Sequence, residues 1–140
     1  MNWIYNHREF TEDQIPEGAV GFVYMMTAFI GGHSYCYIGK KNFYAYVKTK
    51  LSKKALPTDK RKKTYKRVRK TVYQNYYSSN EILKQAHKEG VHITREILMI
   101  CYSNLELSYQ EVKHQFQYEV LEKDYFLNAN ILGRFYKQKK

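Results

Sequence analysis

Two β-forming segments joined by a glycine pair constrain the fold of this chain more than any other feature. Residues 20–30, VGFVYMMTAFI, are rich in β-formers and apolar on both faces, which predicts a buried strand. The glycine pair that follows suits the positive φ angles of a tight turn. In residues 33–41, tyrosines and a glycine on one face alternate with a cysteine and an isoleucine on the other. The sequence therefore predicts an antiparallel hairpin.

The segments after residue 77 carry alternating helix and strand signals. Ser78-Ser79-Asn80 caps a predicted helix over about 80–89, which Gly90 ends. Residues 93–102 predict a central strand. Apolar residues at helical spacing predict an amphipathic helix over 108–123, and residues 128–135 predict a last strand or turn.

These elements predict a single domain over residues 1–140 of the α/β (α+β) class. Its sheet is expected to be small, three-stranded and mostly antiparallel, with helices flanking it. Residues 1–19 are interpreted as a polar lead-in that closes on a Pro-Glu-Gly turn signal. Residues 44–72 form a basic insertion, in which we expect 44–63 to be a loop and 66–77 a short helix or irregular.

The basic insertion holds the whole charge excess of the chain. Twelve of the 24 Lys and Arg residues lie between Lys48 and Lys70, where Asp59 is the one acid, and the net charge is +11. A solvated surface usually mixes both signs, whereas a field of one sign suits a polyanion. Nucleic acid is therefore the expected partner. An anionic membrane surface and the absence of a specific partner stay open, although the insertion lacks an apolar membrane-binding face.

Other classes of site have little support in the sequence. Cys36 and Cys101 are expected to be reduced thiols, because paired Cys and His ligands for zinc are missing. No segment is apolar over the roughly 18 residues that a membrane span needs, and the N-terminus does not resemble a signal peptide. We therefore expect a cytoplasmic protein.

Two tyrosine triplets carry a resemblance to a known family. Phe22-Val23-Tyr24 followed by Tyr37-Ile38-Gly39 resembles the paired signature of the GIY-YIG nuclease superfamily. The second triplet matches in full, whereas the first has Phe22 at the position of its glycine. Taken alone, two tyrosines on paired strands equally suit a stabilised sheet. Similarity to small phage-type and free-standing homing-endonuclease members continues in order over roughly residues 16–134, at Tyr37–Phe43, the basic insertion, Tyr76–Ser79, Arg95–Leu98, Tyr109–Lys113, Gln115-Phe116 and Asn128–Ile131.

The resemblance implies a set of catalytic residues. Glu111 matches the metal-binding glutamate, and a single carboxylate with waters suits Mg²⁺ or Mn²⁺. Tyr24 matches the tyrosine that helps to activate the attacking water, for which positive charge would have to lower its pKa from about 10. Tyr37 matches the tyrosine that orients the water or phosphate, and Asn128 matches a supporting asparagine.

The family also uses an arginine to stabilise charge on the phosphate, and its position here is open. Of Arg61, Arg67 and Arg69, we favour Arg67 or Arg69 because they flank the segment that resembles its relatives. Lys40 or Lys41 could carry part of this role as point charges. The residues expected to contact DNA are Lys40, Lys41, Lys60, Arg61, Lys62, Lys63 and Lys66.

The sequence thus favours a metal-dependent endonuclease that cuts double-stranded DNA. Target selection would come from the insertion, from a homodimer or from a specificity-conferring protein partner. An inactive nucleic-acid-binding module on the same fold is the main alternative, and a structural or partner-binding protein is a third. Structured RNA stays open as the ligand. If the chain is phage-encoded, as the resemblance to phage-type members implies, the expected location is the host cytoplasm.

Overall fold

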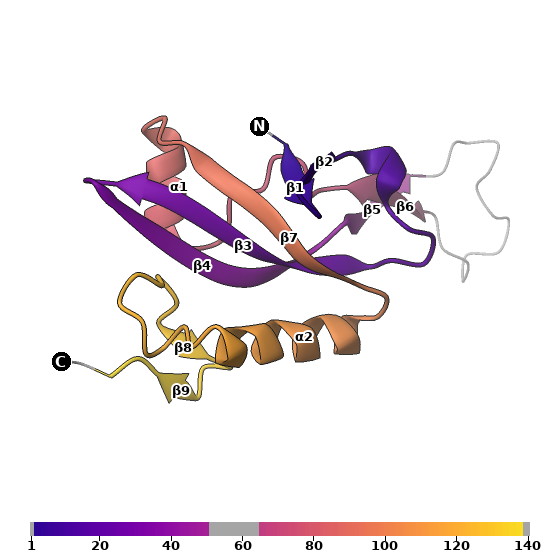
Figure 1. The fold of residues 1–140 in the computed structure, drawn as a ribbon. Coiled ribbons are helices and arrows are strands. Elements are labelled where there is room, and N and C mark those ends of the chain that lie inside the picture. Colours follow the sequence, from indigo (N-terminus) through magenta and orange to yellow (C-terminus); the bar gives the residue numbers. More distant parts are fainter. Residues whose placement is uncertain (1, 51–64, 139–140) are drawn as a thin grey trace, which may run out of the picture.

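A five-stranded sheet forms the centre of the protein. The computed structural model describes residues 2–50 and 65–138. The strand order is β2-β1-β7-β3-β4 (Figure 1), with every neighbouring pair antiparallel except β1 and β7, which are parallel. The strands are β1 (Trp3–Tyr5), β2 (Arg8–Phe10), β3 (Gly21–Ile30), β4 (His33–Asn42) and β7 (Ile93–Cys101).

The predicted central hairpin is confirmed as β3 and β4. Gly31 and Gly32 connect the two strands with φ angles of 58° and 82°, as the glycine pair predicted. β3 also pairs with β7, so these three strands form the mostly antiparallel sheet that the sequence indicated.

The prediction of only three strands is wrong because the lead-in adds two more. Residues 3–5 and 8–10 pair through a turn at Asn6 and His7, which have φ angles of 51° and 65°. Strands of three residues are too short to show a period-2 pattern, so the sequence signal was missed. Trp3 and Phe10 are buried, which explains why this segment packs as part of the sheet.

Residues 44–50 of the basic insertion differ from the predicted loop, while residues 51–63 of that prediction lie outside the described residues. β5 (Tyr44–Lys50) and β6 (Tyr65–Thr71) pair antiparallel as a separate two-stranded ribbon, so the helix alternative for residues 66–77 is wrong. Alternating Tyr, Val and Thr among the cations favour a strand, but the charge of the segment masked that pattern.

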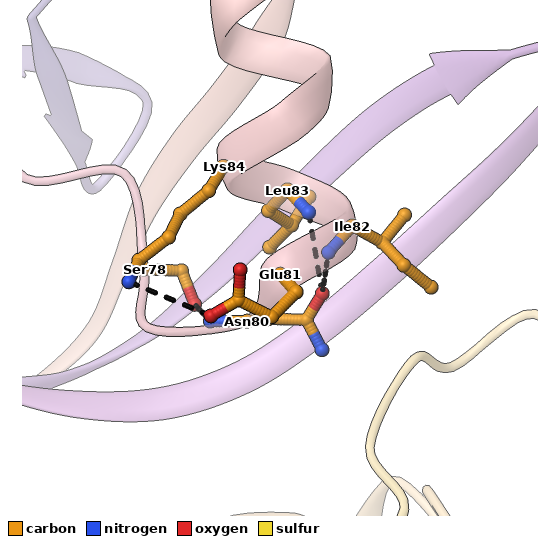
Figure 2. Close-up of polar contacts among 6 residues, drawn as sticks. All are labelled: Ser78, Asn80, Glu81, Ile82, Leu83 and Lys84. Carbon is orange, nitrogen blue, oxygen red and sulfur yellow. Dashed lines mark hydrogen bonds and ion pairs between the residues drawn. The ribbon is translucent and has the colours of Figure 1, made fainter.

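Two helices accompany the sheet, and capping sets their limits. α1 (Glu81–Lys88) begins where the Asn80 side chain accepts hydrogen bonds from the backbone of Ile82 and Leu83 (Figure 2). Gly90 then ends the turn with a φ of 79°, close to the predicted boundary.

α2 (Asn104–Gln117) begins and ends earlier than the predicted 108–123. Ser103 caps the first turn of α2. The helix ends before Glu119, which has a φ of 55°, and the Val120 N–H then donates to the Gln115 carbonyl. The apolar repeat, which began at Tyr109, placed the start of the helix too late, because Tyr109 is 64% exposed and does not belong to the buried face. The remaining elements are a 3-10 turn, η1 (Glu12–Gln14), and a hairpin of β8 (Asn130–Ile131) and β9 (Phe135–Tyr136).

The alternating side chains of β3 divide the interior into two cores. Phe22, Tyr24 and Met26 join the aromatic core that includes Trp3, Phe43 and Tyr73 and reaches Leu83 of α1. Val23 joins the second core with Ile38, Leu107 and Val120, on the side of α2. Cys36 and Cys101 are free thiols, as predicted. None of the helices in the described ranges has the length and apolar composition that crossing a bilayer requires.

Gly21 provides a test of how closely the strands and α2 approach. A Cβ at this position would lie 2.5 Å from the Lys41 carbonyl oxygen and 2.8 Å from Leu107 Cδ2. Gly21→Ala is therefore expected to lower the free energy of unfolding by about 1–3 kcal/mol, measured by urea denaturation. Ser34→Ala, at an exposed position of β4, serves as the control and should change it by less than about 0.5 kcal/mol. Equal stability of the two variants would contradict the close approach.

Candidate active site

Tyr24 lies across the strand that carries Tyr37. The register of β3 and β4 sets Tyr24 opposite Gly39, not opposite Tyr37. A Cβ on Gly39 would lie 2.5 Å from the Tyr24 hydroxyl oxygen, so the absent side chain makes room for the phenol. Tyr24 and Tyr37 are diagonal neighbours with ring centroids 6.3 Å apart, which confirms the predicted proximity. The glycine of the second triplet therefore has a steric role.

The Tyr24 hydroxyl is enclosed by the segment before α1. It donates to Ser78 Oγ at 3.3 Å and lies 3.5 Å from the Tyr76 hydroxyl. Ser78 has a φ of 77° and its Oγ also accepts from the Asn80 N–H at 3.1 Å. Burial, assisted by Tyr76, raises the pKa of Tyr24 far above the ordinary value of a phenol. The neutral hydroxyl is thus the stable form at this position.

Tyr37 is half-buried and lies next to Glu111. Burial raises the pKa of Tyr37, the negative charge of Glu111 raises it further, and a hydrogen bond with Ser79 opposes the rise. Both residues line a cavity of about 350 Å³, whose walls also include Asn80, Gln115 and Asn128. The second tyrosine and the predicted metal ligand therefore share one polar cavity.

Glu111 stands on α2 and faces the end of β4. Burial raises the pKa of its carboxyl group, while the Lys40 charge and a hydrogen bond from the Lys40 backbone oppose that rise. Lys40 Nζ is held by Ser108 Oγ at 2.7 Å, one helical turn before Glu111. The carboxylate is thus partly desolvated but has a cation close to it.

Asn128 completes the outer edge of β4. The segment 125–127 runs beside this edge, with the Cys36 N–H bonded to the Tyr125 carbonyl and the Leu127 N–H bonded to the Cys36 carbonyl. Asn128 continues the pattern with its side chain, which accepts from the Ile38 N–H at 3.1 Å and donates to the Ile38 carbonyl at 2.9 Å. Asn128 therefore fixes the backbone between Tyr37 and Gly39.

Gln115 is a site residue that the sequence analysis did not identify. It is 6% exposed on α2, and its Nε2 donates to the Ile38 carbonyl at 3.1 Å. The sequence places Gln115 one helical turn after Glu111, but a glutamine at such a position can equally lie on the surface of a helix. Gln115 and Asn128 together use both lone pairs of one carbonyl oxygen.

The predicted cations divide between two places. Lys41 Nζ lies 4.4 Å from the centre of the Tyr76 ring, and burial lowers its pKa. Arg69 instead lies over the Tyr44 ring, 4.2 Å from its centre, and lines a different cavity of about 540 Å³ at the root of the ribbon. Among the predicted cations whose side chains the structure describes, Lys40 lies near Glu111, whereas Lys41 lies beside Tyr76.

The other predicted cations have less structural description. Lys60, Arg61, Lys62 and Lys63 lie outside the described residues, and for Lys66 and Arg67 the structure describes the backbone within β6. Phe22, at the position of the missing glycine, is fully buried against Trp3, with ring centroids 4.8 Å apart. It belongs to the core and does not enter the cavity of Glu111.

Arg95 supports the site by binding the segment before α1, a role that the sequence analysis did not assign. Its Nη1 donates to the carbonyls of Gln74 and Tyr76 at 2.7 and 3.0 Å. The guanidinium stacks between Trp3 and Tyr77, at 4.9 and 4.2 Å from their ring centres. Arg95 therefore holds the segment that encloses the Tyr24 hydroxyl.

The donor set of the cavity fits a hard divalent cation. No group of three His, Cys, Asp or Glu side chains comes together among the described residues. The cavity offers the Glu111 carboxylate and several amide side chains, which are oxygen donors. Mg²⁺ is commonly held by one or two carboxylates and retains several waters, so these residues suit Mg²⁺ or the similar Mn²⁺.

Tyr37 and the helix residue Glu111 line one cavity, and the Tyr24 ring lies beside Tyr37, which is the grouping that the resemblance implied. The family model described as "Putative endonuclease segE, GIY-YIG domain" matches residues 3–131. Because this match covers most of the 140 residues, the chain belongs to that family and carries a GIY-YIG endonuclease domain. No curated protein and no solved structure matches the chain.

Asn128→Ala tests the support of β4. Loss of the amide leaves the Ile38 N–H without its acceptor, so the free energy of unfolding should fall by about 1–3 kcal/mol. The Ile38 amide should also exchange with solvent faster, measured by hydrogen exchange in NMR spectra. Asn75→Ala, at an exposed position, is the control and should alter neither quantity. Unchanged exchange at Ile38 would contradict this role of Asn128.

Proposed function

We propose that this protein is a divalent-metal-dependent endonuclease that hydrolyses phosphodiester bonds in double-stranded DNA. The observation that carries the proposal is the shared cavity of Glu111 and Tyr37, in a chain that belongs to an endonuclease family. The acid-poor insertion supplies the positive charge that binding to a polyanion requires.

In this proposal, Glu111 holds the ion and Lys40 keeps the carboxylate ionised despite its burial. A bound Mg²⁺ or Mn²⁺ would act as a Lewis acid that lowers the pKa of water and stabilises charge on the phosphate. The oxygen of the attacking water bonds to phosphorus as the bond between phosphorus and the 3′ oxygen breaks. The water loses one proton and the 3′ oxygen takes one up, which leaves a 5′ phosphate and a 3′ hydroxyl.

The two tyrosines have different roles in the proposal. Tyr37 lines the cavity and its hydroxyl orients the attacking water or the scissile phosphate. Tyr24 is 1% exposed and favours its neutral form, so it positions Tyr76 and Ser78 around the site and relays hydrogen bonds. Asn128 keeps the backbone of Tyr37 and Gly39 in place.

For the charge on the phosphate, we propose Lys40, which acts on Glu111, and Lys41, which lies over the Tyr76 ring. Arg69 lines the cavity at the root of the ribbon and not the cavity of Glu111. We therefore propose that Arg69 and Arg67 contact the DNA backbone and not the scissile phosphate. Lys60, Arg61, Lys62, Lys63 and Lys66 are proposed to contact further phosphates. Recognition through a homodimer or a partner protein, and a cytoplasmic location, remain part of the proposal.

One observation favours an inactive DNA-binding module as the second candidate. Among the described side chains, no arginine lines the cavity that contains Glu111. Without an arginine, a nuclease would have to stabilise the phosphate through lysines, which act as point charges and make no bidentate contact.

Metal-dependent cutting decides between the two functions. Plasmid and linear duplex are incubated with Mg²⁺, with Mn²⁺ or with chelator, and the loss of intact DNA is followed over time. Glu111→Gln should reduce the rate about 10²–10³-fold, a magnitude typical of losing one electrostatic group from an active site. Glu122→Gln, at an exposed position, is the matched control and should cut normally. Tight DNA binding without cutting in the presence of any of these metals would contradict the nuclease and support the inactive DNA-binding module.

The stability of the metal-free protein should depend on pH through Glu111. Because burial raises the pKa of Glu111, folding favours the protonated form, and stability is lost as the pH rises above about 4.3 through the raised pKa. Glu111→Gln should therefore melt at a higher temperature than wild type at pH 7 but not near pH 4. Added Mg²⁺ should raise the melting temperature of wild type and of Glu122→Gln, but not that of Glu111→Gln. Identical melting of wild type and Glu111→Gln at pH 7 would contradict this account.

A further inference from the structure

The ribbon of β5 and β6 is exposed on both faces. Tyr46 is 58% exposed, and the directly paired Val47 and Val68 are 43% and 37% exposed. A two-stranded ribbon without a buried face gains little stability of its own. Figure 1 shows the ribbon beside the five-stranded sheet at the end where the chain leaves β4, with the short η1 next to it.

The root of the ribbon, in contrast, is fixed in the aromatic core. Phe43 and Tyr73 are 0% and 2% exposed, and their rings meet edge to face with centroids 5.2 Å apart. The Val72 N–H donates to the Phe43 carbonyl at 3.0 Å, and the Thr71 hydroxyl donates to Glu12 at 2.8 Å. The ribbon is therefore a projecting arm on a rigid base.

The pairing register separates the two faces of the arm. Tyr44, Tyr46 and Arg69 share one face, and they line the cavity at the root together with residues 15–20. The opposite face carries Val47 and Val68, with Lys70 opposite Ala45. This second face has exposed apolar side chains at its middle and a cation beside them.

The charge of the arm is of one sign. The strands YAYVKTK and YKRVRKT contain six Lys or Arg residues and no acid. Of these, Lys48, Arg69 and Lys70 are exposed. The phosphate backbones on either side of a DNA groove complement such an excess of cations, whereas a neutral protein surface does not.

We propose that the ribbon of β5 and β6 enters the major groove of duplex DNA, with Val47 and Val68 toward the base edges. This inference rests on the proposed function, since it takes duplex DNA as the substrate. Paired strands lie about 4.8 Å apart, and the major groove, about 12 Å wide, admits a two-stranded ribbon. Apolar side chains there can contact the methyl group of thymine, while the lysines reach the phosphates.

The same arm is joined to the catalytic strand without a flexible connection. β4 ends at Asn42 and β5 begins at Tyr44, with the buried Phe43 between them. Ten residues separate Tyr37 from Val47, which limits their separation to about 33–36 Å. This distance is about one turn of DNA, so the bases that the ribbon contacts lie within one turn of the bond that is cut.

Competition with groove ligands tests the proposal directly. The full chain is bound to a labelled 30-base-pair duplex without metal, and binding is measured by fluorescence anisotropy. Methyl green, a cationic major-groove ligand, should displace the protein at concentrations where netropsin, a cationic minor-groove ligand, does not. Displacement by netropsin alone, or equal displacement by both, would overturn the proposal.

Two double variants separate the charges from the apolar face. Lys66→Ala with Lys70→Ala, at the two positions that flank Val68 on the same face of β6, should flatten the slope of log K against log salt concentration by about 1.8, since each phosphate contact contributes about 0.9. Val47→Ser with Val68→Ser should leave that slope unchanged and weaken binding by about tenfold. Lys84→Ala with Lys88→Ala, on α1, is the matched control. Ribbon variants that bind as the control does would overturn the proposal.

The outcome also distinguishes this inference from the proposed function. If the wild-type protein neither binds nor cuts duplex DNA, the proposed function fails. If it cuts DNA and both ribbon variants cut and bind as wild type does, the groove assignment fails alone.

Discussion

The packing of Tyr24 over Gly39 is the constraint on which the rest of the site depends. One side chain contributes to the aromatic core, crosses the neighbouring strand and presents a hydroxyl to the segment before α1. A residue with a Cβ at position 39 would push this ring away and separate β3 from β4. The core and the site therefore share a single steric requirement, and changes that loosen one also disturb the other.

Around this contact, elements distant in the sequence meet at the backbone of a single residue, Ile38. The Ile38 carbonyl accepts from Asn128 and from Gln115, and the Ile38 N–H donates to Asn128. An outer strand with unpaired backbone groups invites association with other chains, and here the side chains of two other segments take the place of a further strand. The polar interactions that protect the edge of β4 also hold Tyr37 beside Glu111.

The sequence predicted the parts of the structure that have strong local signals. The Gly31-Gly32 hairpin, the Asn80 cap and the association of Tyr24 with Tyr37 follow from short-range rules, whereas pairing Tyr37 with Glu111 required the family resemblance. The sequence did not predict β1 and β2, which are too short for periodicity, nor β5 and β6, whose charge resembles that of a loop. Gln115 and Arg95 were missed because their roles depend on which backbone carbonyls they reach, and that is settled only by the tertiary fold.

The stack of Arg95 between Trp3 and Tyr77 has a consequence for synthesis of the chain. The first strand, at Trp3, and the late Asn128 both support the same few residues around the cavity. During translation, β3 and β4 emerge well before the segment 125–128 that completes the edge of β4. The cavity is therefore assembled only after Asn128 has left the ribosome, and a translation product truncated before that residue carries an unfinished site.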